Sequence, residues 1–298
     1  MYWNNLNDHL KAVYGAKVYK LALSSGCSCP NRDGTLGTRG CIFCDGAGSF
    51  AETGDIPTQL ERAKRRVAAK TGAGTKYIAY FQSFTNTYGD AERLEAMYRQ
   101  AIEAEDVVAL SIATRPDCLP PKVLHMLERL SKVKPVWVEL GLQTIHPETA
   151  AYIRRGYELH VYDEAVQRLH DVGTEVVVHQ ILGLPGENAD MMTKTAQYIG
   201  QSGADGIKFH LLHVLRNTDL AAQWLEGKFH TMELEEYIGV LEACVRNIPR
   251  ELVIHRLTGD GAKKDLLAPL WSGDKKRVLN AIHAAFLRDD VEQGSALR

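Results

Sequence analysis

The sequence lacks long apolar runs, a strong excess of either charge, and the features of an exported protein. No stretch of it approaches the ~18–20 apolar residues that a membrane-spanning helix needs, and its first residues, MYWNNLNDHLK, are too polar for a secretory signal. The formal net charge is −2, so the molecule as a whole has no general attraction for a polyanion, although local patches could still bind one. We therefore expect a soluble cytoplasmic protein with no membrane partner.

Cysteine is also scarce, and its placement is uneven. The 298 residues contain six cysteines, and without an export signal we expect reduced thiols rather than a disulfide framework. Four of the six lie between Gly26 and Ser49, in a stretch that also holds six glycines and shows no apolar periodicity. A long irregular loop inside a compact domain needs a reason. The spacing of its cysteines indicates a loop that wraps a metal centre.

Apolar runs alternate with amphipathic helical patterns through most of the chain. Near-continuous apolar runs of this kind are typical of parallel strands that are buried on both faces. With right-handed crossovers, such units form a barrel or an open arc. We therefore predict an α/β fold, a partial (β/α)6-type barrel over residues 1–256, with a short helical extension over 257–298. The predicted strands are residues 17–23, 77–81, 107–113, 136–142, 175–182, 206–214 and 251–256.

Polar residues recur at the ends of these predicted strands, where ligands bind in α/β barrels. A buried polar side chain is costly unless it faces a partner or a site, so their repetition predicts a ligand pocket. The polar groups are Gln82–Asn86, Thr114–Asp117, Glu139 with Gln143, His179 with Gln180, and His210 with His213. Because His210 and His213 differ by three within one predicted strand, at most one of them is expected to face the pocket.

Two interpretations of the cysteine loop remain open from spacing alone. Cys41 and Cys44 form a C-x-x-C pair that Cys27 and Cys29 could complete as a structural zinc site. Alternatively, Cys29, Cys41 and Cys44 could hold an iron–sulfur cluster with one iron left open. The predicted pocket favours the cluster, because a structural zinc needs no pocket. Cys244 lies on the apolar stripe of a helix and is expected in the core, and Cys118 is expected to be a plain loop thiol.

Several motifs together resemble the YhcC/YtqA-type radical SAM family, which is related to the radical SAM half of the Elongator catalytic subunit. They include Cys29-Pro-Asn-Arg-Asp-Gly-Thr, Gly40-Cys-Ile-Phe-Cys44, and the run from His179 to Glu187. The family lengthens the first interval of the usual C-x3-C-x2-C pattern to eleven residues, and this chain shares that interval. The resemblance implies the partial TIM barrel of radical SAM enzymes.

The resemblance also implies cofactors and their ligands. Cys29, Cys41 and Cys44 would hold a single 4Fe-4S cluster, and S-adenosyl-L-methionine (SAM) would bind its fourth iron. Reductive cleavage of SAM would then give a 5′-deoxyadenosyl radical, with the protein positioning and shielding the chemistry. Eight residues would contact SAM: Phe43, Gly183 and Leu184 at the adenine, Gln82 and Asn86 at the methionine amine, Glu139 and Gln143 at the ribose or methionine, and Arg155 at the carboxylate.

The expected substrate follows from the same resemblance. It implies a tRNA whose wobble-uridine side chain is modified, with an electron donor such as flavodoxin or ferredoxin. Two basic sets, within residues 62–76 and 263–277, could together form a surface for RNA phosphates, although each could equally be a solvated face. The alternatives are a radical SAM enzyme acting on a small molecule or peptide, and a non-catalytic RNA-binding module with a structural zinc.

Overall fold

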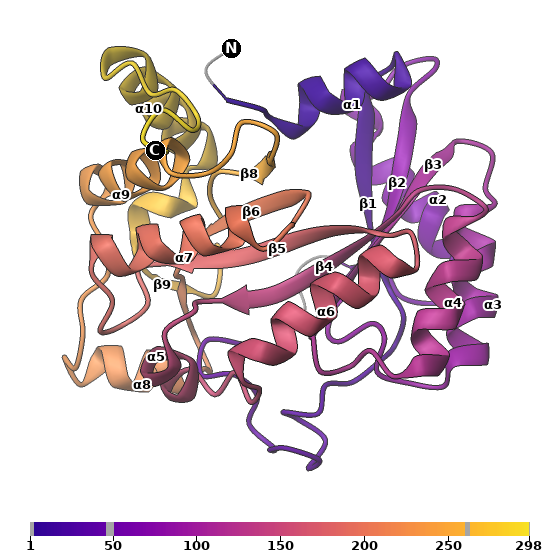
Figure 1. Ribbon diagram of the computed structural model, residues 1–298, viewed down its shortest axis with the longest axis horizontal. Helices are drawn as coiled ribbons and strands as arrows, with labels where there is room; N and C mark the ends of the chain where they lie inside the picture. The colour runs from indigo at the N-terminus through magenta and orange to yellow at the C-terminus, as the bar shows by residue number, and fades with distance from the viewer. Residues whose placement is uncertain (1–2, 46–50, 260–262, 298) are drawn as a thin grey trace.

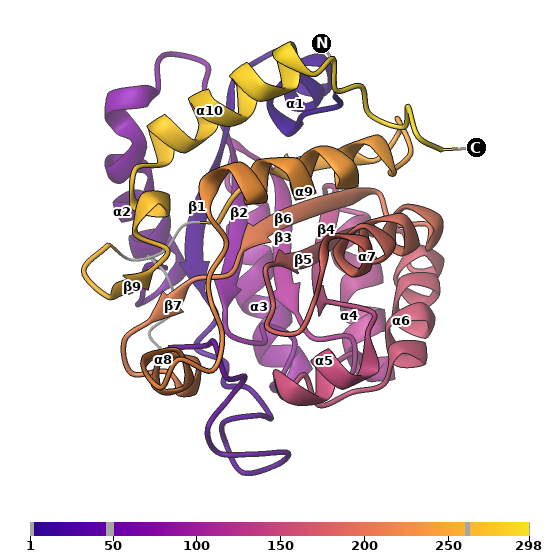
Figure 2. The same ribbon diagram turned by 90° about the vertical axis from the view of Figure 1, so that its left-hand side faces the viewer.

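The computed structural model describes residues 3–45, 51–259 and 263–297. Its centre is a seven-stranded sheet in the order β1-β2-β3-β4-β5-β6-β8, in which every neighbouring pair is parallel. The sheet curls into an open barrel (Figures 1 and 2). The strands are β1 (Val18–Ser24), β2 (Lys76–Ser83), β3 (Val107–Thr114), β4 (Val136–Gln143), β5 (Glu175–Leu182), β6 (Gly206–Leu211) and β8 (Val253–Arg256). The predicted partial barrel is confirmed.

Helices connect successive strands and cover the outer face of the sheet (Figure 1). Each connection crosses from one parallel strand to the next, as parallel pairing requires. The helices are α1 (Leu6–Tyr14), α2 (Ile56–Val67), α3 (Ala91–Ile102), α4 (Pro121–Ser131), α5 (Pro147–Tyr152), α6 (Leu159–Asp171), α7 (Ala189–Gln201), α8 (Asp219–Leu225), α9 (Leu234–Arg246) and α10 (Lys275–Arg288), with short 3-10 turns η1 (Ala68–Lys70) and η2 (Leu270–Gly273).

The two faces of the strands bury different layers. Alternate side chains on a strand point to opposite faces, and one set packs with the outer helices in the main apolar core. The other set forms a smaller apolar layer that α1 contributes to and that fills the amino-terminal end of the barrel. Its buried members are Leu10, Val18, Ile78, Ala109, Trp137 and Val177.

The two ends of the chain meet at this same end of the barrel. Asn5 forms an isolated parallel bridge with Ile254 of β8, and the Trp3 ring packs edge-on against Phe286 of α10. Figure 2 shows α10 running past α1. These contacts fasten the lead-in and the last helix to β8, the outermost strand, which has only one neighbour in the sheet.

One predicted strand boundary is wrong. The strand expected over residues 206–214 ends at Leu211, and Val214–Leu215 forms a separate strand, β7, that pairs antiparallel with β9 (Leu266–Ala268). Pairing with β9 takes residues 214–215 out of the barrel sheet. The apolar run over residues 206–214 does not predict this pairing. The argument that His210 and His213 alternate along one strand therefore fails. The division at residue 256 stays a prediction.

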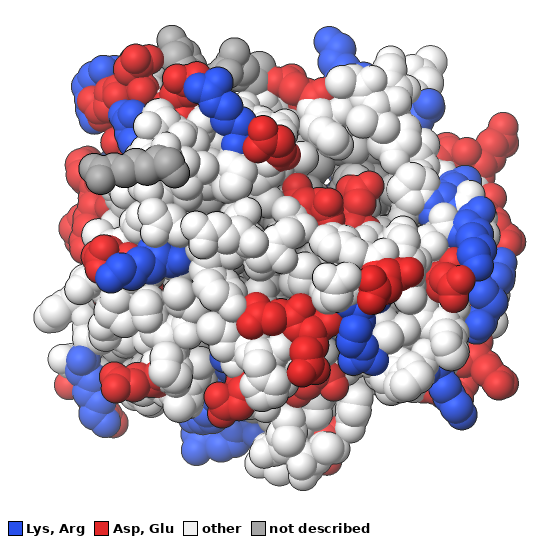
Figure 3. All heavy atoms as spheres, in the orientation of Figure 1, with Lys and Arg blue, Asp and Glu red and all other residues white. Residues whose placement is uncertain are grey.

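The two basic sets do not form one surface. Figure 1 places α2 and α10 at opposite ends of the molecule. On α2, Lys64 pairs with Asp106 and Arg66 pairs with Glu52, which fits a solvated helix face. The face shown in Figure 3 carries both charges interspersed over α6 and α7. Among the described helices, none has the length and apolar character to cross a membrane.

Candidate active site

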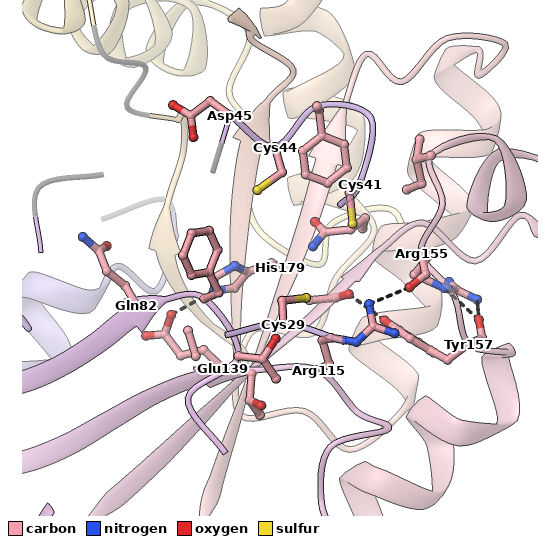
Figure 4. A pocket seen from close by; sticks show the side chains of 18 residues that line it. Cys29, Cys41, Cys44, Asp45, Gln82, Arg115, Glu139, Arg155, Tyr157 and His179 are labelled. Atoms are coloured by element: carbon pink, nitrogen blue, oxygen red, sulfur yellow. Dashed lines mark hydrogen bonds and ion pairs between the residues drawn. The ribbon is translucent and has the colours of Figure 1, made fainter. Parts of the chain in front are cut away.

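The loop that follows β1 brings three cysteines to one cavity. Cys29, Cys41 and Cys44 all line a cavity of about 310 Å³, together with residues from the carboxyl ends of β2 to β5. Figure 4 shows the three thiols facing a common space, with Glu139, His179 and Gln82 on one side and Arg115, Arg155 and Tyr157 on the other. The strand ends thus meet the loop at one site, as the parallel sheet predicts.

Two residues of the loop fix its shape. The Asn31 side-chain amide donates to the Arg154 carbonyl at 2.8 Å and lies 3.6 Å from the Cys41 sulfur. The Arg32 guanidinium donates to the Cys44 carbonyl at 2.7 Å. Gly40 has a φ of +74°, and a Cβ there would lie 2.9 Å from Arg32 Nε, so the close approach of Arg32 requires glycine. Asn31 and Arg32 therefore position the cysteines without reaching the cavity themselves.

The C-x-x-C segment is also tied to the barrel through Ile42. The Ile42 amide donates to the Ile153 carbonyl at 3.2 Å, and its own carbonyl accepts from Leu220 of α8 at 2.9 Å. The Ile42 side chain is buried in a small apolar cluster with Ile153 and Leu220. Because Ile42 is anchored on three sides, Cys41 and Cys44 on either side of it are held at the cavity.

Cys27 is not part of the cysteine set at the cavity. It is buried in the main core, with its sulfur 3.7 Å from Arg93 Nη2, and it does not line the cavity. The zinc interpretation needs Cys27 as the fourth ligand, so the geometry does not support it.

The arrangement of the three thiols fits an iron–sulfur cluster. Among the described residues, no three His, Cys, Asp or Glu side chains lie close enough together to hold a single metal ion. In a 4Fe-4S cluster each cysteine binds a different iron, so the three thiols need not converge on one ion. Burial raises the pKa of the Cys41 thiol to about 11, and a bound metal centre is what stabilises a thiolate in such surroundings.

Glu139 forms the floor of the cavity and is fully buried. Its Oε1 accepts from Lys20 Nζ and from Ser111 Oγ, both at 2.7 Å. Its Oε2 accepts from His179 Nε2 at 2.8 Å and from Lys208 Nζ. Burial alone would raise the pKa of this carboxyl, but Lys20 and Lys208 hold it well below its usual value. The carboxylate is therefore ionised, with all four of its acceptor positions filled by the protein.

His179 stands between this floor and a second, adjoining chamber. It lines both the cavity and a chamber of about 220 Å³, which also shares Phe43 and Gln143 with the cavity. Burial lowers the pKa of His179 to about 4, so the imidazole is neutral at neutral pH. Because the ionised Glu139 can only accept, Nε2 carries the proton and Nδ1 is left as an acceptor. His210, in the same chamber, has its ring centroid 4.9 Å from that of His179.

The opposite wall is built from two arginines and a tyrosine. The Arg155 guanidinium stacks over the Tyr157 ring at 4.5 Å, and Arg115 lies 5.4 Å from the same ring. Arg115 makes a two-pronged ion pair with Asp117 and also donates to the Arg155 carbonyl. The Arg155 side chain donates to the Thr144 carbonyl at 2.6 Å. These mutual contacts make the wall rigid before any ligand binds.

The end of β4 carries an unusual backbone conformation. Gln143 has a φ of 69°, a left-handed value that non-glycine residues adopt rarely and that clusters at functional sites. The register between β4 and β5 shifts between Leu140 and Gln143. This irregularity lets Gln143 line both the cavity and the adjoining chamber.

The eight expected SAM contacts fall into two groups. Phe43, Gln82, Glu139, Gln143 and Arg155 line the cavity, and their contacts with SAM stay predictions. Asn86, Gly183 and Leu184 do not line it.

The residues of the second group lie in the core or beside it, and their contacts with SAM also stay predictions. Asn86 is fully buried, and its side chain bonds Ser25 and the Phe81 and Ala113 carbonyls. The Gly183 amide faces the Met192 sulfur at 3.0 Å, and Leu184 is buried in the cluster around Ile42.

Sequence reasoning gave no specific role to several other residues of the cavity. Thr85, Arg115 and Tyr157 line it; the first two lay in polar segments that were expected to form a pocket, whereas Tyr157 was missed. Tyr157 gave no signal, because it follows the short helix α5, which was not predicted. In the cavity wall opposite Glu139, the sequence therefore indicated the two arginines but not the tyrosine between them.

Comparison with known families agrees with this geometry. A model of the radical SAM superfamily matches residues 34–199, and a model of the radical SAM C-terminal domain matches residues 204–288. The chain belongs to the radical SAM superfamily. As a radical SAM protein it shares the two cofactors of the superfamily, a 4Fe-4S cluster and SAM. That Cys29, Cys41 and Cys44 hold the cluster stays a prediction.

Full-length relatives place it within the YhcC/YtqA-type family. YtqA of Bacillus subtilis is 44% identical over 285 residues, which make up 94% of this chain and 88% of that protein. YhcC of Escherichia coli is 37% identical over 295 residues, 99% of this chain and 95% of that protein.

The chain is also similar to a tRNA uridine(34) acetyltransferase and to a solved Elp3 structure. A tRNA uridine(34) acetyltransferase of Methanocaldococcus jannaschii is 30% identical over 193 residues, 61% of this chain but only 35% of that protein. The solved Elp3 of Methanocaldococcus infernus aligns with a TM-score of 0.72 at 19% identity, covering 93% of this chain and 64% of that one. The second similarity supports the radical SAM fold alone.

Proposed function

We propose that this radical SAM enzyme modifies the side chain of the wobble uridine of tRNA. The observation that carries the radical SAM part is the meeting of Cys29, Cys41 and Cys44 at one cavity that the ends of β2 to β5 also line. The tRNA part is supported by the similarity to the tRNA uridine(34) acetyltransferase. It takes no support from the basic residues of α2, which pair with neighbouring carboxylates.

The residues of the cavity have distinct roles in this proposal. Cys29, Cys41 and Cys44 would hold the cluster, which together with bound SAM would supply a 5′-deoxyadenosyl radical for hydrogen abstraction. Phe43 and Gln143 line both cavities and bind the nucleoside part of SAM, because together they offer an apolar ring and an amide.

An external electron donor completes the reaction, because a radical SAM enzyme needs one electron for each SAM cleaved. A flavodoxin or a ferredoxin would supply it. Cys29, Cys41 and Cys44 are each partly exposed, so the cluster ligands lie near the molecular surface.

The proposal is tested with the anaerobically reconstituted full chain, SAM and a chemical reductant. Purified tRNA from a strain that lacks this protein is the substrate, and its nucleosides are analysed by mass spectrometry. A mass change at the wobble uridine, dependent on SAM and abolished in Cys41→Ala, is the expected result. Unchanged tRNA nucleosides together with turnover of a small metabolite or a peptide would support the alternative substrate class instead.

A further inference from the structure

A two-stranded ribbon borders the cysteine-lined cavity. It pairs β7 with β9, with Val214 opposite Ala268, and both of these side chains are buried in the apolar cluster of Ile42, the residue that follows Cys41. Leu215 of β7 lines the chamber that adjoins the cavity. A molecule bound on the outer side of this ribbon would therefore lie close to the candidate active site.

The exposed end of the ribbon carries several basic residues. Arg216 directly follows β7, and its backbone N–H donates to the Asp265 carbonyl at 2.8 Å. This bond places Arg216 beside the segment that precedes β9, which contains Lys263 and Lys264. Together with residues 276–277 at the start of α10, a lysine and an arginine, these exposed residues form what we call the basic face.

The turn η2 connects the ribbon to α10 and keeps the two together. A Cβ on Gly273 of η2 would lie 3.7 Å from Leu266 Cδ2 of β9, and α10 begins shortly after it, at Lys275. Figure 2 shows β7, β9 and the lower end of α10 on the same side of the molecule. Lys276 and Arg277 therefore belong to the same region of the surface as the basic residues of the ribbon.

The charges of the basic face are not balanced within the protein. Among the ion pairs of the described residues, Lys264 is the one member of the face with a partner, Asp265 at 4.0 Å, and its side chain is 86% exposed. Residues 214–216 and 263–277 together contain six basic and two acidic residues, although the whole chain has a net charge of −2. A local positive field of this kind attracts polyanions.

The basic helix α2 differs in this respect. Three of its basic residues, Lys64, Arg65 and Arg66, each pair with a carboxylate, and α2 lies at the other end of the molecule from α10 (Figure 1). Basic residues that only keep a surface solvated would leave the two regions alike. The unpaired charges beside the cavity therefore favour a binding role for the basic face.

We propose that the basic face binds the phosphate backbone of the RNA substrate beside the cavity. This inference rests on the proposed function, because it places the anticodon arm of a tRNA across the ribbon with its wobble nucleotide at the cavity. Lysine and arginine contacts to phosphates position a nucleic acid without reading its bases, so the basic face orients the RNA and the cavity selects the nucleotide. Because phosphate binding releases counterions, the affinity falls steeply with salt.

The test measures the Kd of an anticodon stem-loop RNA by fluorescence anisotropy at several KCl concentrations, with the reconstituted full chain and SAM. Two double variants remove charges from the basic face: Lys263→Gln with Lys264→Gln, and Lys276→Gln with Arg277→Gln. Each should weaken binding and lower the slope of log Kd against log salt by about 1.5, because each lost phosphate contact lowers it by about 0.7–0.9. An RNA with cytidine at the wobble position should be weakened equally, since its phosphates are the same.

Arg62→Gln with Lys70→Gln is the matched control, because it removes two exposed charges of the same sign from α2 and the turn that follows it. It should keep the wild-type Kd and slope. The iron content after reconstitution and the Tm check that each variant is folded. If a double variant of the basic face does not fold, Arg216→Gln carries the test, with a fall in slope of about 0.7–0.9.

The outcomes separate this inference from the proposed function. If the wild type modifies tRNA but the variants of the basic face bind RNA as the wild type or the control does, the inference is overturned and the proposed function stands. If these variants bind RNA normally but need more reduced flavodoxin for SAM cleavage, the basic face belongs to the electron donor, which also overturns the inference alone. If the wild type binds neither RNA, both proposals fail.

Discussion

Two regions meet at the cavity and are assembled differently. One is the cysteine loop, and the other is the ionic layer, the buried cluster in which Lys20 and Lys208 pair with Glu139. The loop draws its three thiols from sixteen consecutive residues, 29–44, and fixes them with neighbours such as Asn31 and Arg32. The ionic layer joins Lys20, Glu139 and Lys208, each from a different strand, through direct ion pairs. The cysteines of the cavity are thus encoded locally, whereas the ion pairs of its floor depend on the whole barrel. The two regions should respond differently to single substitutions.

The largest effect is expected in the loop, on activity. Replacement of Cys29, Cys41 or Cys44 by Ala should abolish reductive SAM cleavage, measured as 5′-deoxyadenosine formation by liquid chromatography, because each removes a ligand of the cluster. The fold should remain, since the three side chains are only partly buried. Cys27→Ala and Cys244→Ala are the controls, because both thiols are buried away from the cavity. Equal loss in Cys27→Ala would contradict the assigned ligand set.

The ionic layer should instead show its largest effect on stability. Glu139→Gln leaves two ammonium groups without their shared carboxylate, and removal of one partner from a buried ion pair costs about 3–5 kcal/mol. The free energy of unfolding of the apoprotein, from urea titrations, measures this. Glu95→Gln is the control, since Glu95 pairs with the more exposed Arg99 and Arg129, and pairs of that kind contribute at most about 1 kcal/mol. Similar losses of unfolding free energy in Glu139→Gln and Glu95→Gln would contradict the expectation that the buried ion pairs contribute more to stability than the exposed ones.

The pH dependence of stability should reveal the neutral histidine of the floor. Burial lowers the pKa of His179 from 6.5 to about 4, so between these values the unfolded chain binds a proton that the folded chain does not. Stability from this group is full above pH 6.5 and falls as the pH drops toward 4.

His179→Gln should reduce the slope of unfolding free energy against pH by up to about 1.4 kcal/mol per unit between pH 6.5 and 4.5. Some slope will remain, because burial also lowers the pKa of His210 and His255. Glu139, whose pKa is depressed below 4.5, contributes only at lower pH. An unchanged slope in His179→Gln would show that His179 is protonated in the folded state.

The smallest effect compares two glycines with similar backbone conformations. Gly40→Ala places a Cβ 2.9 Å from Arg32 Nε at a φ of +74°, whereas Gly15→Ala, at +64°, meets no atom within 4 Å. Both should lose about 1 kcal/mol from the left-handed conformation. Only Gly40→Ala should also lower the iron content after reconstitution, because it moves Arg32 away from the Cys44 carbonyl. The comparison fails if the two variants bind the same amount of iron.

The sequence predicts the parts of this molecule whose signals are local. The seven strands follow from continuous apolar runs, and the three cavity cysteines follow from their spacing together with the family resemblance. The end of β6 and the strands β7 and β9 could not be predicted, since their pairing joins residues about fifty apart. The buried position of Asn86 could not be predicted for a similar reason. A polar residue just after a strand predicts a ligand contact, but its side chain satisfies two backbone carbonyls and Ser25 in the core.

The ion pairs of Glu139 were even less predictable from the sequence. Glu139 was recognised as a polar residue in an apolar strand, but nothing in the sequence showed that Lys20 and Lys208 would meet it. The partners of a barrel side chain depend on the stagger between strands, and one sequence does not give that stagger. The floor of the site is therefore a result of the structure.

We propose that Cys29, Cys41 and Cys44, without Cys27, hold one 4Fe-4S cluster. The most direct measurement is the iron, sulfide and zinc content of the anaerobically reconstituted wild type and of the four single Cys→Ala variants at these positions. We expect about four irons and four sulfides per chain in the wild type and in Cys27→Ala. Iron and sulfide should be clearly lower in the Ala variants of Cys29, Cys41 and Cys44. One zinc per chain, no iron, and a requirement for Cys27 would contradict it.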